Sequence, residues 1–360
     1  MTDNKLKAVV VGAGYWGPNL ARNFRASADW ELAGVCDLDE ARAQKVADSV
    51  GGVPIWTRLD DVLADPTVDA VAIATPARTH HPIALAALDA GKHVMVEKPL
   101  ADTTARGEDM VARAEERGLV LMADHTYCYT PAVLKIREII ADGGLGDILF
   151  VDSTRINLGL IQPDVDVFWD LAPHDLSIMD FVLPGGLDTT SVSAHGSDPL
   201  RTGKACVGYL AMPLACGAMA HVNVNWLSPT KIRQMVIGGT KRTLVWDDLN
   251  PQQRISVYDR GVDIDTVSKE TTLDRRAANI SYRLGDTWSP ALDEREALGG
   301  VVAELAAAIR DGRPARTSGE AGMRVLSVLD AAQRSLAAGG APAPMTLDIQ
   351  PQRSHRSTAA

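Results

Sequence analysis

The stretch Lys7-Ala8-Val9-Val10-Val11-Gly12-Ala13-Gly14-Tyr15-Trp16-Gly17 joins an apolar, β-branched run to the glycine pattern G-x-G-x-x-G. The run predicts a buried strand and residues 20–24 predict a helix, so the glycines fall in the turn between them. There Gly12 allows the tight turn, Gly14 lets the backbone approach a pyrophosphate, and Gly17 lets helix and strand pack closely. Amides at the helix N-terminus favour phosphate. The stretch therefore predicts a dinucleotide-binding fold.

Asp37 follows the next strand candidate, 32–36, and stands 20 residues after the last glycine of the motif. A carboxylate at that distance accepts hydrogen bonds from the ribose hydroxyls of NAD. It also repels the 2′-phosphate of NADP, although Arg42 lies nearby. The alternative is that Asp37 only caps the helix that begins near Asp39. We expect NAD as the cofactor rather than NADP.

Outward from this motif, apolar runs alternate with segments of helical period through the first third of the chain. This alternation predicts a doubly wound parallel sheet with helices on both faces, a Rossmann domain over residues 1–123. The strand candidates are 7–11, 32–36, 70–74, 93–96 and 119–123, and the helix candidates are 15–24, 39–50, 79–90 and 103–117.

After residue 124 the pattern changes to period-2 alternation, which is typical of a half-solvated sheet. We expect an α+β domain over 124–349, with a large, mixed, mostly antiparallel open sheet that serves substrate binding and oligomerisation, and a disordered tail over 350–360. The strand candidates are 148–156, 190–194, 205–212, 218–225, 233–237, 243–246 and 255–258. The helix candidates are 132–141, 171–183, 294–310 and 319–338.

The composition is that of an ordinary globular protein, with 46% hydrophobic and 23% charged residues among 360. A net charge of −10 argues against a nucleic-acid partner. No apolar run approaches the ~18 residues of a membrane span, and the N-terminus lacks the apolar core of a secretory signal, so we expect a cytoplasmic protein with no membrane partner. No metal-ligand spacing is evident. The four cysteines are expected to be buried free thiols: Cys36, Cys128, Cys206 and Cys216.

Further motifs follow the glycine loop in order. Ala74-Thr75-Pro76 precedes Thr79-His80, Val96-Glu97-Lys98-Pro99-Leu100 closes the strand candidate 93–96, and Asp170-x-x-x-His174 follows later in the chain. Together with the glycine loop, these motifs resemble the Gfo/Idh/MocA family of NAD(P)-dependent oxidoreductases. The similarity is to the branch that acts on nucleotide-linked or amino sugars.

The resemblance implies a second domain whose open sheet forms an oligomer interface, so we expect a homodimer or homotetramer. It extends to His125-Thr126-Tyr127, although Asp124 stands where a small residue is expected. The residues that it places at the cofactor, together with Asp37, are Gly12, Gly14, Tyr15, Trp16, Gly17, Thr75, Pro76, His80, Glu97 and Lys98.

Oxidation of a secondary alcohol requires a base for the hydroxyl proton and a group that stabilises the alkoxide. Lys98 ends a strand, at the edge where ligands bind open α/β sheets, and Pro99 biases it away from helical geometry. Asp170 and His174 lie one helical turn apart. Pro173 is expected in the first turn, which places Asp170 near the N-cap and lets the positive helix end favour a neutral His174. We assign catalysis to Lys98, His174 and Asp170; which of the first two is the base stays open.

Arg155 and Asn157 alternate on a strand that enters the predicted site. They would hydrogen-bond a polyol or phosphate, or else belong to a solvated sheet face. The other candidates for contact with a sugar or nucleotide are Tyr127, Trp169, Trp226, Lys231 and Tyr282.

The resemblance and these residues predict an NAD-dependent dehydrogenase of carbohydrate or antibiotic biosynthesis. Its reaction would oxidise a ring secondary hydroxyl, such as that at C3, of a nucleotide sugar, amino sugar or aminoglycoside to a keto sugar. Run in reverse, the same site reduces a ketosugar. A cyclitol (inositol-type) dehydrogenase, an NAD-dependent glycosidase with transient oxidation, and a non-catalytic NAD-binding protein are the alternatives.

Overall fold

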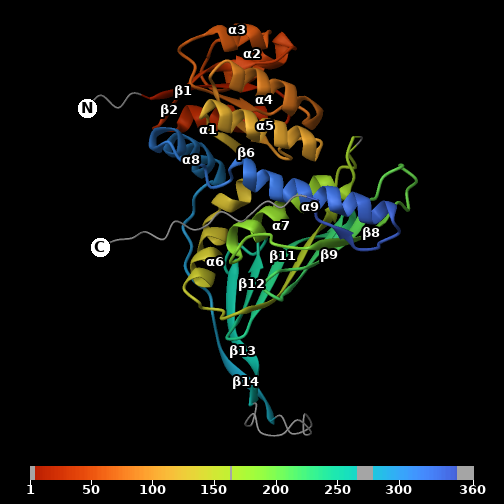
Figure 1. Cartoon of the computed structure of the whole chain (residues 1–360). Helices are drawn as coiled ribbons and strands as arrows, with labels where there is room; N and C mark the ends of the chain where they lie inside the picture. The colour runs from red at the N-terminus through yellow and green to blue at the C-terminus, as the bar shows by residue number, and fades with distance from the viewer. Residues whose placement is uncertain (1–4, 163, 266–278, 347–360) are drawn as a thin grey trace.

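The computed structural model describes residues 5–162, 164–265 and 279–346. Its N-terminal part is a parallel sheet with helices on both faces, as the alternation predicts (Figure 1). The strand order β3-β2-β1-β4-β5-β6 is that of a Rossmann fold. The strands are β1 (Leu6–Val11), β2 (Trp30–Cys36), β3 (Ile55–Trp56), β4 (Ala70–Ile73), β5 (His93–Glu97) and β6 (Leu121–Asp124). The helices are α1 (Gly17–Ala26), α2 (Glu40–Ser49), α3 (Leu59–Ala64), α4 (His80–Asp89) and α5 (Thr104–Arg117).

Both faces of this sheet are covered, which explains its continuous apolar strands. Ala8 and Val10 of β1 belong to one apolar core, while Val9 and Val11 belong to the core on the opposite face. The first core includes α1 and also α8 (Ala297–Asp311), so the chain returns from its C-terminal part to complete it. The predicted boundary at residue 124 therefore lies between the two sheets. It does not divide their cores, because α8, from beyond that boundary, belongs to a core of the first sheet.

The second sheet is mixed and mostly antiparallel, as predicted, in the order β14-β13-β12-β11-β7-β10-β9-β8-β15. Only β7 and β10 run parallel among its described strand pairs. The strands are β7 (Ile148–Leu158), β8 (Ser191–Ser197), β9 (Val207–Pro213), β10 (Met219–Asn225), β11 (Leu227–Gly239), β12 (Thr243–Asp247), β13 (Ile255–Asp265), β14 (Asn279–Trp288) and β15 (Ala343–Pro344). Of these, β14 and β15 were not predicted.

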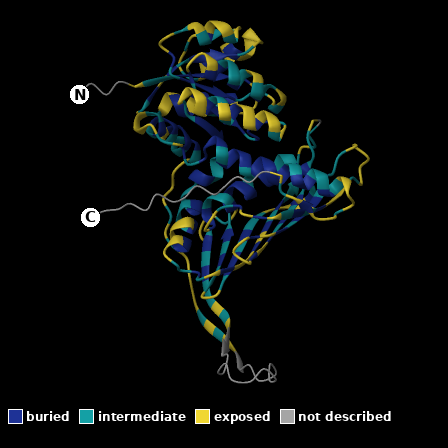
Figure 2. Cartoon of the chain, in the orientation of Figure 1, coloured by how far each residue is buried: buried dark blue, intermediate teal, exposed yellow. Residues whose placement is uncertain are grey.

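One face of this sheet packs against α6 (Pro131–Ala141), α7 (Val167–Val182) and α9 (Gly319–Ala337). Figure 2 shows buried residues gathered where these helices meet the sheet, whereas the β13–β14 hairpin is mostly exposed or half-buried and extends away from the Rossmann sheet. The alternation read from the sequence thus corresponds to one covered and one open face.

Helix α9 and the residues before it connect the two sheets. The amide of Ala123, in β6, donates to the carbonyl of Thr317 at 2.8 Å, and the Thr317 hydroxyl donates back to the Ala123 carbonyl at 2.6 Å. Tyr129 shares a hydrogen bond with the same hydroxyl at 2.9 Å. Beyond this anchor, α9 packs on α5 at one end and on α7 and β8 at the other. The two halves therefore meet along a hydrogen-bonded seam.

Helix α7 starts earlier than predicted. Its N-cap is Asp166, whose side chain accepts from the amides of Phe168 at 3.0 Å and Trp169 at 3.1 Å. Pro173 therefore lies inside the helix, and the prediction that it stands in the first turn is wrong, whereas Asp170 is in that turn. An interior proline costs about 3 kcal/mol. Burial of the apolar face of α7, which includes Phe168, offsets that cost.

Two other expectations concern the cysteines and the chain end. All four thiols are free, but Cys216 is exposed, so the expectation of burial is wrong for it and confirmed for the other three. Cys216 lies in the turn between β9 and β10, where no helix covers it. The predicted tail, 350–360, lies outside the described residues. Within the described ranges, no helix has the length and apolar character that a membrane span requires.

The hydrogen bond from Trp30 to α8 gives a test of how α8 is held. The Trp30 indole nitrogen donates to the carbonyl of Val302 at 2.7 Å, and the ring is 1% exposed. We expect Trp30→Phe to lower the free energy of unfolding by about 2 kcal/mol, because the Val302 carbonyl loses its indole donor and the smaller ring leaves a cavity. Urea unfolding measures it. As the control, Trp288→Phe, at a ring 42% exposed, should change it by less than about 0.5 kcal/mol. Equal effects of the two variants would contradict the assignment.

Candidate active site

The glycine loop has the shape of a phosphate cradle. Gly12 has φ of +104°, and a Cβ there would lie 2.8 Å from the backbone of Ala74. A Cβ on Gly17, where α1 begins, would lie 2.1 Å from the Gly12 carbonyl oxygen. A Cβ on Gly14 would meet nothing within 4 Å. The loop is thus closed on the protein side at Gly12 and Gly17 and open at Gly14, which fits the approach of a pyrophosphate.

Asp37 faces this loop. Its carboxylate accepts from the amide of Ala13 at 2.7 Å and from the amide of Asp39 at 2.9 Å. The N-cap of α2 is Asp39, whose side chain accepts from the Arg42 amide and also pairs with the Arg42 guanidinium at 3.1 Å. The capping role is therefore filled by Asp39, and Asp37 stands beside the glycine turn.

The other residues expected at the cofactor divide into exposed and buried groups. Tyr15 and Trp16 project from the glycine loop, 89% and 37% exposed, with their rings edge to face. His80 is 1% exposed, and its ring nitrogens lie 2.8 Å from the Thr75 carbonyl and 2.9 Å from the Pro99 carbonyl. His80 therefore ties together the loops after β4 and β5. Pro76, between them, is exposed.

Lys98 contacts Asp170 across the gap between the two sheets. Its ammonium donates to the Asp170 carbonyl at 2.9 Å and to Oδ1 of the Asp170 carboxylate at 3.2 Å. The Trp226 indole nitrogen donates to the other carboxylate oxygen at 3.0 Å, and Trp226 is 1% exposed. Both oxygens of Asp170 are thus engaged, and the orientation of the Lys98 side chain is set from the second domain.

His174 lies one turn after Asp170 on α7 and is half-buried. Its ring stands edge to face with the Tyr127 ring, with 5.1 Å between the two ring centroids. Burial lowers its pKa well below 6.5, and the positive charges of Lys98 and Arg155 lower it further. The expected cause, the positive end of the helix, is wrong because α7 begins at Val167, seven residues earlier. The neutral form is favoured by burial and neighbouring cations.

Two carboxyl groups lie side by side behind Lys98. Glu97 and Asp124 are register partners on β5 and β6 and are 7% and 1% exposed. Burial raises the pKa of both carboxyls, and Asp124 raises that of Glu97 further. Carboxyls this close share a proton rather than both ionise. The pair therefore places no more than one negative charge behind Lys98, whose amide donates to Glu97 at 3.2 Å.

The candidates for substrate contact lie in different places. Arg155 is buried and pairs with Asp175, at 2.6 Å and 3.1 Å, rather than facing the gap. Asn157 is half-buried, and its amide and the Trp226 ring both border Gly159. Lys231 is exposed in the irregular part of β11. Tyr282, 75% exposed, is on the β13–β14 hairpin, which extends away from the Rossmann sheet (Figure 1).

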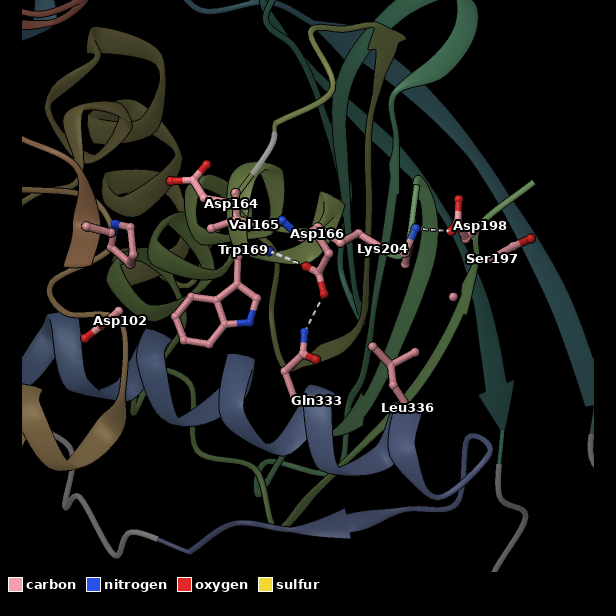
Figure 3. Close-up of a pocket in the computed structure, with 15 residues that line it drawn as sticks. Asp102, Asp164, Val165, Asp166, Trp169, Ser197, Asp198, Lys204, Gln333 and Leu336 are labelled. Carbon is pink, nitrogen blue, oxygen red and sulfur yellow. Dashed lines mark hydrogen bonds between the residues drawn. The ribbon is translucent and has the colours of Figure 1, made fainter. Parts of the chain in front are cut away.

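A pocket of about 700 Å³ adjoins this centre (Figure 3). Pro99, which follows Lys98, and Trp169, which precedes Asp170, both line it. At its centre Asp166 accepts from the Gln333 side chain of α9 at 2.5 Å. Among the described lining residues, the carboxylates outnumber the cations: Asp102, Asp164, Asp166 and Asp198 against Lys204, although Asp102 also pairs with Arg106 at 2.7 Å. The pocket is therefore acidic.

Asp175, Asp166 and Gln333 were not among the expected site residues. A buried arginine on a strand requires a carboxylate partner, and Asp175 beside His174 is the signal that was missed. Asp166 was not expected as the N-cap, because a proline is expected in the first turn and Pro173 therefore predicts a later start of the helix. Across the part of the chain that the structure describes, no group of three His, Cys, Asp or Glu residues is arranged to hold a metal ion.

Two family models match the chain. The NAD-binding Rossmann fold of the GFO/IDH/MocA oxidoreductases matches residues 6–125, and the GFO/IDH/MocA C-terminal domain matches residues 133–245.

Similar proteins include sugar dehydrogenases. The UDP-N-acetylglucosamine 3-dehydrogenase of Acidithiobacillus ferrooxidans is 29% identical over 327 residues, 89% of this chain and 94% of that protein. The D-glucoside 3-dehydrogenase of Escherichia coli is 30% identical over 218 residues, 57% of this chain and 62% of that protein. The crystal structure of GenD2 from gentamicin A biosynthesis in complex with NAD matches with a TM-score of 0.78 and 27% identity, covering 96% of this chain and 97% of that one.

The two faces of the glycine loop give a paired test. We expect Gly14→Ala to fold as stably as the parent chain but to bind NAD roughly tenfold or more weakly, because its methyl group occupies the open side of the cradle. Gly17→Ala should lower both the melting temperature and NAD affinity, because its methyl group meets the Gly12 carbonyl. Calorimetric titration with NAD and thermal unfolding measure the two effects. Unchanged NAD affinity in Gly14→Ala would contradict the cradle.

Proposed function

The chain belongs to the GFO/IDH/MocA family of oxidoreductases, and we propose that it oxidises a ring secondary hydroxyl of an amino sugar to a ketone with NAD. The observation that carries this proposal is the cluster of Lys98, Asp170 and His174 between the two sheets, with an acidic pocket beside it.

The residues present fit NAD. Gly14 offers the open face to the pyrophosphate, the N-terminus of α1 supplies amides, and Asp37 beside the turn would accept from the ribose hydroxyls. Tyr15 and Trp16 project on the same loop. When bound, NAD supplies the acceptor for the hydride that leaves the substrate carbon.

The three side chains divide the proton chemistry. His174, held neutral, would accept the hydroxyl proton. The Lys98 ammonium has three N–H donors, of which two point to Asp170, so the third can stabilise the developing alkoxide. Asp170, bound by Lys98 and Trp226, acts by orienting Lys98. The choice of His174 as the base rests on its burial among cations.

The charge of the pocket favours an amino sugar over a nucleotide sugar. Relatives of both kinds exist, since one similar protein is named for UDP-N-acetylglucosamine and another comes from gentamicin A biosynthesis. Asp102, Asp164, Asp166 and Asp198 would attract an ammonium group on the part of the substrate beyond the oxidised ring and repel a diphosphate. An aminoglycoside or its amino-sugar precursor meets this requirement.

Incubation with NAD and a substrate panel tests the proposal. Net NADH, followed by absorbance, is expected with aminoglycosides and not with UDP-N-acetylglucosamine or inositol. Net NADH with the nucleotide sugar alone would contradict the substrate class. Cleavage of a glycoside without net NADH would identify an NAD-dependent glycosidase, and NADH consumption with a ketosugar would identify the reductive direction.

We also infer a homodimer or homotetramer formed through the open face of the second sheet. Phe150, Tyr209 and Met219 lie on that face and are 36–51% exposed, although large apolar side chains are usually covered. A cytoplasmic location stays a prediction from the scattered cysteines.

Loss of either proton-handling side chain should stop turnover. We expect Lys98→Ala and His174→Ala each to lower kcat by roughly 10²–10⁴-fold, with NAD affinity little changed, and the double variant to be little worse than either. Because the pKa of His174 is lowered, its neutral form persists above that pKa and kcat should fall only as pH drops below 6.5. Steady-state rates against pH measure both. Near-full turnover in His174→Ala, with Lys98→Ala inactive, would make the lysine the base.

A further inference from the structure

A buried ion pair lies beneath the proposed base. Arg155 of β7 donates from Nε to Asp175 at 2.6 Å and from Nη2 to the second carboxylate oxygen at 3.1 Å. The side chains are 3% and 2% exposed. Burying two charges costs several kcal/mol per ion before their attraction is counted, so such a pair is a weak source of stability. Its place beside His174 suggests a different role.

Tyr127 connects this pair to His174. The third donor of Arg155, Nη1, bonds the Tyr127 hydroxyl at 3.1 Å, and the guanidinium lies 4.6 Å from the centre of the Tyr127 ring. The same ring stands edge to face with His174 at 5.1 Å and with Trp246 at 6.0 Å. Tyr127 is thus held by the Arg155 guanidinium and by the rings of Trp246 and His174. Because the Tyr127 ring contacts the His174 imidazole, the position of Tyr127 limits where that imidazole can lie.

The pair presents its positive end toward His174. Asp175 is the next residue on α7, and neighbouring helical residues point about 100° apart, so its carboxylate faces Arg155 rather than the imidazole. The other groups that act on His174 are Lys98 after β5, His125 before α6 and Arg233 of β11, all cations or bases. The nearby carboxylate of Asp170 is occupied by Lys98 and Trp226.

We propose that Arg155 and Asp175 are positioning residues, which fix the imidazole of His174 through Tyr127 and hold a positive charge beside it. The proposal rests on the proposed function, in which His174 takes the substrate proton. It replaces the expectation that Arg155 binds substrate.

The test removes the pair without leaving a lone buried charge. In Arg155→Met with Asp175→Leu, apolar side chains of similar size replace both ions. We expect the His174 titration midpoint to rise by about one pH unit. NMR measures this midpoint, and the His174 signal is assigned as the one that is absent in His174→Gln. With substrate, kcat should fall about tenfold from the loss of orientation, with KM little changed.

A matched control is available on the same helix. Arg324 pairs with Asp180 at 2.6 Å and 2.8 Å, 11% and 6% exposed, without contact to Tyr127. Arg324→Met with Asp180→Leu should leave the His174 midpoint unchanged. Arg155→Lys keeps the charge but loses the planar fork, so it should retain the midpoint while kcat falls.

Two results would overturn the proposal: the same His174 titration with and without the Arg155–Asp175 pair, or an equal shift in the control variant. The NMR titration needs no substrate, so it decides the role of the pair even if the proposed reaction is wrong. Conversely, the midpoint of His174 could shift in the double variant although the protein oxidises no sugar. That result would support the role of Arg155 and Asp175 and would reject only the proposed function.

Discussion

The contact between the Lys98 ammonium and Asp170 is the interaction on which the proposed chemistry depends. It joins the end of β5 in one sheet to α7 on the other, so it forms only when both halves are folded and docked. The carboxylate is fixed from the far side by the Trp226 indole, and the seam between Ala123 and Thr317 sets the distance between the halves. The precision of the centre is therefore a property of the interface, where an error of 1 Å costs orders of magnitude in rate.

Burial governs protonation throughout this region. Burial and neighbouring cations lower the pKa of His174 and favour its neutral form, whereas burial raises the pKa of both Glu97 and Asp124. His125 is also fully buried, and burial lowers its pKa to about 4. A site arranged in this way has its charges in place before substrate arrives, which is the main requirement for electrostatic stabilisation of an alkoxide.

The pocket that adjoins the centre is formed by a separate set of residues. Two similar proteins are named for UDP-N-acetylglucosamine and for D-glucoside, and a third comes from gentamicin A biosynthesis. In this chain the pocket beside Trp169 is built from the loop after β5, the start of α7, α9 and the loop between β8 and β9. Its carboxylates, Asp102, Asp164, Asp166 and Asp198, come from three segments of the chain and are distinct from Lys98, Asp170 and His174.

The sequence by itself determined the Rossmann domain and the mixed second sheet, because these depend on local periodicity. It also suggested the residues of the proposed centre, through motifs that resemble a known family. The glycine loop, the strand ending at Lys98 and the four-residue spacing of Asp170 and His174 are all local signals.

Only the tertiary structure decided which charges meet. From the sequence, Arg155 is equally suited to binding substrate and to a solvated sheet face. In the structure it hydrogen-bonds Asp175 and Tyr127. Pro173 misplaced the start of α7, because the burial that tolerates an interior proline is not visible in a local pattern. Nor does periodicity show that Trp226 binds Asp170 or that α8 completes the first core. Contacts between residues far apart in the chain depend on packing, and packing depends on the whole fold.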